Sequence, residues 1–156
     1  SPGKKIEIMH DQLTGAGGLV LGLMTILATA FCIAQLDQNF ILQSLIVSEV
    51  SAKLGMVVIA WVGRSAREGT NTCFIEAMHG QYRKVRLIVA LSISFGLALS
   101  LSCFAGFVAV IVGVVVALIL VGISNRHFKG VTGDIFGAGN EIVRFTSLIA
   151  ILIVLR

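Results

Sequence analysis

An uncharged run of 38 residues constrains the fold of this chain more than any other feature of its sequence. The run extends from residue 87 to residue 124 and is almost entirely apolar. One membrane-spanning helix needs roughly 20 apolar residues, so the run is long enough to cross a bilayer twice. We therefore expect a helical hairpin, with spans at residues 87–103 and 107–124 and a turn between them.

The composition of the whole chain also indicates an integral membrane protein. Its 156 residues are 56% hydrophobic and 13% charged, whereas soluble domains average about 25% charged residues. Further apolar segments predict spans at residues 17–36, 40–62 and 135–155, which makes about five spans in all. We expect an all-α, polytopic transmembrane helical bundle, embedded in the lipid bilayer as a single domain over residues 1–156.

The basic residues gather on one predicted side of this bundle. Five spans would place residues 1–16, 63–86 and 125–134 on the same side, and these segments hold most of the cations: Lys4, Lys5, Arg64, Arg67, Arg83, Lys84, Arg86, Arg126 and Lys129. Loops rich in lysine and arginine face the cytoplasm. We therefore expect a protein of the cytoplasmic membrane. The net charge of +4 is explained by these loops, so we expect no nucleic-acid partner.

Residues 130–141, with the sequence GVTGDIFGAGNE, lie between a basic loop and the last apolar segment. Gly130 and Gly133 permit close backbone approaches, and Thr132 or Asp134 is a candidate helix cap. A helix N-terminus with free N–H groups binds phosphate. A turn followed by an N-cap explains the same residues, so both interpretations stay open.

Several polar residues fall inside predicted spans, where each charge costs about 2.5–3.5 kcal/mol. Glu49 and Lys53 are four residues apart, and Glu141 and Arg144 are three apart, so each pair can form an ion pair along its helix. In one interpretation these pairs only stabilise the bundle. In the functional interpretation, Lys53 faces an anionic substrate in the cavity.

Acidic residues beside glycines occur on the predicted cytoplasmic side. Asp11 precedes the glycine-rich start of the first span, Arg67-Glu68-Gly69 forms a turn-like sequence, and Asp134 precedes the last span. Mg²⁺ prefers carboxylate and phosphate oxygens, and nearby cations stabilise charge on a leaving phosphate. These residues are typical of a site for a phosphorylated substrate held through Mg²⁺.

Three blocks of the sequence resemble the cobalamin synthase family, also called adenosylcobinamide-GDP ribazoletransferase. They are KKIEIMHDQLTGAGGLVLG at residues 4–22, AKLGMVVIAWVGRSAREGTNTCF at residues 52–74 and KGVTGDIFGAGNE at residues 129–141. The resemblance implies a membrane transferase of cobalamin biosynthesis. Such an enzyme joins adenosylcobinamide-GDP to α-ribazole or its 5′-phosphate, gives adenosylcobalamin or its 5′-phosphate, and releases GMP with the help of Mg²⁺.

The resemblance also implies roles for individual residues. Asp11 and Asp134 would be the catalytic pair that holds the metal or the phosphate. Phosphate charge would be bound by Lys53, Arg67 and Lys129. The phosphate loop would be shaped by Gly130, Thr132 and Gly133, and the cavity would be lined by Asn140 and Glu141.

The chain departs from the family pattern in two ways. An aspartate-rich block that precedes this region in the family is missing here, so we expect the chain to be a fragment of a longer protein. Position 53 holds Lys where the family pattern has Arg. This difference weakens phosphate binding, because a lysine ammonium cannot form the bidentate contact of a guanidinium. The resemblance leaves the oligomeric state open and is compatible with an oligomer.

Two other functions are consistent with these residues. A transporter or channel would use Glu49, Lys53, Asn140, Glu141 and Arg144 to line its path, although no inverted repeat is evident. A non-catalytic membrane subunit would use the same motifs only for helix packing.

Overall fold

The computed structural model describes residues 16–66 and 70–156, and all the regular elements within these ranges are helices. They are α2 (Ala16–Ala34), α3 (Ile41–Val62), α4 (Thr70–His79), α5 (Arg83–Phe128) and α6 (Gly133–Leu155). The predicted all-α fold is confirmed. Asp11 and Arg67 lie outside the described residues.

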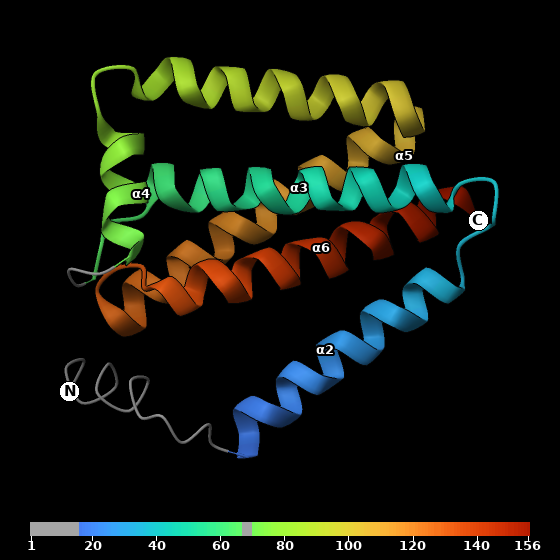
Figure 1. Ribbon diagram of the computed structural model, residues 1–156, viewed down its shortest axis with the longest axis horizontal. Helices are drawn as coiled ribbons and strands as arrows, with labels where there is room; N and C mark the ends of the chain where they lie inside the picture. The colour runs from blue at the N-terminus through green and yellow to red at the C-terminus, as the bar shows by residue number, and fades with distance from the viewer. Residues whose placement is uncertain (1–15, 67–69) are drawn as a thin grey trace.

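Helix α5 consists of two arms, because its helical conformation is interrupted at Ser102 and Cys103. Cys103 has φ 43° and ψ −122°, a conformation that residues with a side chain rarely adopt. The first arm runs beside α3, and the second returns behind α3 towards the start of α6 (Figure 1). The long uncharged run therefore folds back on itself close to where its length predicts a turn.

Gly106 allows the two arms of α5 to approach each other closely. A Cβ atom on Gly106 would lie 2.2 Å from the carbonyl oxygen of Ala98 and 2.7 Å from its carbonyl carbon. Ala98 itself is fully buried. Since backbone atoms cannot move aside as a flexible side chain can, only glycine fits at this contact.

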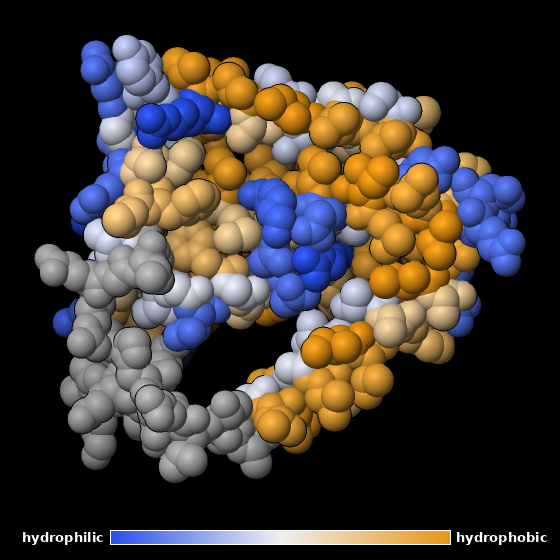
Figure 2. Space-filling view, viewed as in Figure 1, coloured by the Kyte–Doolittle hydropathy of each residue, from blue (hydrophilic) through white to orange (hydrophobic). Residues whose placement is uncertain are grey.

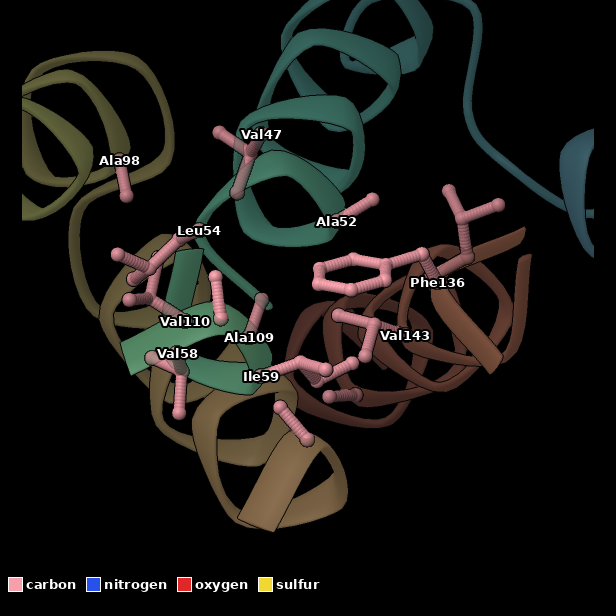
Figure 3. Packing of buried hydrophobic residues seen from close by; sticks show 14 of the residues in the cluster. Val47, Ala52, Leu54, Val58, Ile59, Ala98, Ala109, Val110, Phe136 and Val143 are labelled. Carbon is pink, nitrogen blue, oxygen red and sulfur yellow. The ribbon is translucent and has the colours of Figure 1, made fainter. Parts of the chain in front are cut away.

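The core lies where α3, α6 and the second arm of α5 meet. Val143 of α6 is fully buried. A Cβ atom would lie 3.0 Å from a methyl group of Val143 whether it were added to Gly55 of α3 or to Gly113 of α5. Figure 3 shows side chains from all three helices around Val143 and Ile59. Small residues at these crossings bring the helix axes close together, as is common in membrane bundles.

The outer surface of the bundle is suited to contact with lipid. Helices α3, α5 and α6 are each long and apolar enough to cross a membrane, and Gly18–Ala34 is a shorter apolar helix. Large apolar side chains point outward, and Leu21 and Phe31 on α2 are 70% and 66% exposed. Figure 2 shows that apolar residues dominate the visible face. The protein is a helical membrane bundle.

The contact at Gly106 makes a prediction about stability. Gly106→Ala should lower the free energy of unfolding by about 1–3 kcal/mol, because the new methyl group overlaps the Ala98 carbonyl. Gly122→Ala is the matched control in the same helix, since a Cβ there meets nothing within 4 Å. That control should be neutral or stabilising by up to about 1 kcal/mol. Unfolding by SDS in mixed micelles measures both, and equal effects would contradict the proposed contact.

Candidate functional site

The segments that follow α3 and precede α6 are joined by backbone hydrogen bonds. The amide of Val131 donates to the carbonyl oxygen of Arg64 at 2.7 Å, and the amide of Ala66 donates to the carbonyl oxygen of Val131 at 3.1 Å. These bonds form a short parallel bridge between Ser65 and Val131. We call residues 63–66 and 129–134 the loop cluster.

Glycines make this pairing possible. A Cβ atom on Gly130 would lie 2.7 Å from the backbone nitrogen and Cα of Ala66 and from the carbonyl oxygen of Arg64. A Cβ atom on Gly63 would lie 2.6 Å from a methyl group of Val131. The close approach that the sequence indicates at Gly130 is therefore present, and its partner is the segment that follows α3.

The loop cluster presents basic and acidic side chains to the outside. Arg64, Lys129 and Asp134 are all exposed. Within the described residues none of the three has an ion-pair partner. Lys129 ends α5 with a left-handed φ of 62°. Asp134 lies in the first turn of α6, where the positive end of the helix dipole stabilises a carboxylate.

Thr132 occupies the N-cap position of α6 but does not cap the helix through its side chain. Its backbone is extended, and no side-chain cap hydrogen bond is formed. The hydroxyl oxygen is buried without a hydrogen-bond partner in the part of the chain that the structure describes. The expectation of a side-chain cap from Thr132 or Asp134 is therefore wrong, because Thr132 at the N-cap position forms no cap bond and Asp134 lies one residue inside the helix, past that position.

A closed ring of five side chains connects the middles of α3 and α6. Lys53 Nζ contacts Glu49 Oε1 at 3.0 Å, and Arg144 Nε contacts Glu49 Oε2 at 2.8 Å. Arg144 Nη1 contacts Glu141 Oε2 at 2.7 Å. Asn140 completes the ring, since its amide nitrogen donates to Glu141 at 3.0 Å and its amide oxygen accepts from Lys53 at 3.0 Å. We call this set the charged ring.

The charged ring is electrically neutral as a whole. It contains two cations and two carboxylates, and each cation contacts at least one carboxylate. A single charge at the membrane centre costs about 2.5–3.5 kcal/mol on the insertion scale, and mutual pairing offsets that cost. The ring therefore allows four ionisable groups to lie between two apolar helices.

The ring shows how far helical spacing predicts contacts. The pairs within each helix, Glu49 with Lys53 and Glu141 with Arg144, form as their spacing predicts. The contacts between helices, above all that of Arg144 with Glu49, have no signal in the spacing of a single sequence. Glu49 and Arg144 were consequently not among the predicted site residues, although their positions inside predicted spans already marked them as unusual.

The predicted site residues that the structure describes, which exclude Asp11 and Arg67, fall into two groups. The first group lies in the loop cluster: Lys129, Gly130, Thr132, Gly133 and Asp134. The second group, Lys53, Asn140 and Glu141, lies in the charged ring. Asp134 and Glu141 are seven positions apart in α6, which corresponds to a rise of about 10 Å.

The described residues do not form a metal site of their own. Within residues 16–66 and 70–156, no group of three or more His, Cys, Asp or Glu side chains could hold a metal ion.

Comparison with known proteins finds relatives that align with nearly the whole chain. The adenosylcobinamide-GDP ribazoletransferase of Methanocella arvoryzae is 33% identical, over 93% of this chain and 59% of its own length. The enzymes of the same name from Methanosarcina mazei and Thermococcus kodakarensis are 30% and 29% identical, over 98% and 97% of this chain and 60% and 62% of their own lengths. No solved structure matches the chain.

The relatives are longer than this chain, which spans about three-fifths of their length. The family profile described as cobalamin-5-phosphate synthase matches residues 1–152. With the relatives, this match identifies the chain as a member of the cobalamin-5-phosphate synthase family.

Proposed function

We propose that the full-length protein joins adenosylcobinamide-GDP to α-ribazole, or to its 5′-phosphate, and releases GMP. The relatives carry the name of this activity, and the family description names the phosphorylated product. A transporter is not favoured, because the relatives are named as transferases. The same names disfavour a purely structural subunit.

The pairing of residues 64–66 with Val131 is the observation that carries this proposal. It brings Arg64 and Lys129 to the same end of the bundle as Asp134. Arg67 directly follows Ala66 in the sequence, so a further cation belongs to this segment. Cations beside a helix N-terminus bind the charge of a diphosphate and stabilise the charge that develops on a leaving phosphate.

The bond changes follow from the substrates and the product. A ribose hydroxyl oxygen of ribazole bonds to the phosphorus that carries cobinamide, and the bond from that phosphorus to the bridging oxygen breaks. GMP leaves with the bridging oxygen, and the hydroxyl proton passes to a nearby base or to water. The family description names a product that retains a 5-phosphate. In that reaction the 5′ oxygen already carries a phosphate, so the attacking oxygen belongs to another hydroxyl of the ribose.

Mg²⁺ fits the donor chemistry of the loop cluster. Asp134 supplies an exposed carboxylate at the start of α6. Mg²⁺ commonly binds through one or two carboxylates together with substrate phosphates. Asp134, with Asp11 as its partner, would hold the ion, and the ion would neutralise charge on the diphosphate. Lys129 and Arg67 would contact the remaining phosphate oxygens, while Gly130, Thr132 and Gly133 shape the loop.

The charge distribution favours a site that faces the cytoplasm. The loop cluster and both ends of α5 lie at one end of the bundle, and the turn between α2 and α3 lies at the other (Figure 1). The first end carries Arg64, Arg83, Arg126 and Lys129, whereas Arg156 lies at the second. Basic ends of membrane helices remain in the cytoplasm. We therefore place the protein in the cytoplasmic membrane, with its substrates arriving from inside the cell.

The proposed role of Asp134 makes a prediction about turnover. In the full-length protein, Asp134→Asn should lower GMP release about 100-fold or more, because the substituted amide cannot share a cation with phosphate. Asp37→Asn is the matched control at the opposite end, where an amide oxygen can still accept the hydrogen bond from the Asn39 amide. GMP is measured by chromatography after both substrates are supplied. Near-normal turnover with Asp134→Asn would contradict the role.

The Mg²⁺ proposal makes a separate prediction about metal removal. Chelation of divalent ions should stop GMP release by the wild-type protein, and added Mg²⁺ should restore it, because the diphosphate charge would otherwise lack a counter-ion. Asp134→Asn should need more Mg²⁺ for its residual turnover. Full activity in the presence of excess chelator would exclude a dissociable metal ion.

A further inference from the structure

The charged ring lies between two apolar clefts. A cleft of about 630 Å³ separates α2 from α6 and reaches Glu141, and its walls include Gly22 and Gly137. A second cleft, of about 270 Å³, separates α3 from the first arm of α5 and reaches Glu49 and Lys53. Figure 2 shows a hydrophilic patch over α3 and α6 in the middle of an apolar face. The ring is therefore a polar site with a mostly apolar cleft on each side.

The side chains of the ring are accessible and have hydrogen-bonding capacity left over. The side chains of Lys53 and Glu141 are 60% and 48% exposed. Lys53 has three N–H donors, of which the ring uses two, towards Glu49 and Asn140. Each carboxylate has about four acceptor positions, and the ring fills only part of them. Free donors and free acceptors thus lie next to one another.

This arrangement disfavours an anion as the ligand. Both cations already contact carboxylates. A phosphate bound to the free donor of Lys53 would lie close to the carboxylates of Glu49 and Glu141, whose negative charge repels it. A neutral group that both donates and accepts hydrogen bonds meets no such repulsion. Carboxamides and hydroxyls are groups of this kind.

We propose that the charged ring binds uncharged carboxamide or hydroxyl groups on a ligand whose apolar body occupies the adjoining clefts. The inference rests on the proposed function, in which two substrates carry such groups. Cobinamide has carboxamide side chains around a large macrocycle, and α-ribazole has ribose hydroxyls beside an apolar aromatic base. The ring lies about 10 Å along α6 from Asp134, so one substrate can place its phosphates at the loop cluster and its body here.

Direct binding tests this proposal without relying on turnover. Full-length wild-type protein in nanodiscs is titrated separately with cobinamide, which lacks the GDP group, and with α-ribazole. Glu141→Gln removes a charged acceptor at constant size, and Glu76→Gln makes the same change at an exposed residue of α4. Glu141→Gln should weaken binding of one probe about tenfold, while Glu76→Gln leaves it within twofold. Loss for cobinamide alone assigns the ring to the cobinamide substrate, and loss for α-ribazole alone assigns it to the ribazole substrate.

A second variant keeps the test decisive if Glu141→Gln does not fold. Lys53→Gln removes the most exposed donor of the ring and should weaken the same probe. The proposal is overturned if both variants bind both probes as the wild type does, or if the wild type binds neither. Competition of inorganic phosphate with the bound probe, lost in Lys53→Gln, would overturn it too by showing an anion site.

Turnover by the same proteins distinguishes the two proposals. If the wild type releases no GMP although it binds a probe in a Glu141-dependent way, the proposed reaction fails while the binding site stands. If the wild type releases GMP and Glu141→Gln changes neither KM, the reaction stands and the binding role of the ring fails. The proposal predicts a raised KM for the substrate that carries the recognised group.

Discussion

The antiparallel packing of α3 against α6 determines where the candidate functional groups lie. At one end the helices are joined through the hydrogen bonds between Arg64, Ala66 and Val131. In the middle Arg144 of α6 donates to Glu49 of α3 at 2.8 Å. Between these points Gly55 receives the buried side chain of Val143. A change in register between the two helices would separate all three contacts at once.

This packing creates two polar regions at different depths. The loop cluster lies at the end of the helices, where water and lipid headgroups are near and unpaired cations such as Lys129 cost little. The charged ring lies between apolar helices, where unpaired charges are costly and a neutral set of paired charges is tolerated. The distribution favours recognition of phosphate at the membrane surface and recognition of uncharged groups within the bundle. The proposed substrate, with its charged diphosphate and neutral body, suits both regions.

Much of the helical architecture could be predicted from the sequence, because long apolar runs leave few alternatives in a bilayer. The reversal within residues 87–124 and the ion pairs along α3 and α6 depend on length and spacing, which a single sequence displays. Which helices face one another depends on packing across the bundle. The bond between Arg144 and Glu49 therefore had no sequence signal.

In the loop cluster, too, some features could be predicted from the sequence and the contacts between segments could not. The glycines at residues 130 and 133 marked a tight segment, but nothing in the sequence identified the backbone of Arg64 and Ala66 as its partner. The side-chain cap expected at Thr132 failed, because propensity does not determine where a hydroxyl points once the segment packs against another. Asp11 and Arg67 belong to the same predicted site, and their positions decide whether that site is complete.

Cross-linking between positions 11 and 134 tests the central claim, that groups from distant segments meet at one end of the bundle to hold a diphosphate. Cysteines replace Asp11 and Asp134 in the full-length protein, after removal of Cys32, Cys73 and Cys103. The account predicts rapid cross-linking by a short bifunctional reagent, with both cysteines labelled from the same side of the membrane. Labelling of the two positions from opposite sides, with no cross-link, would contradict it.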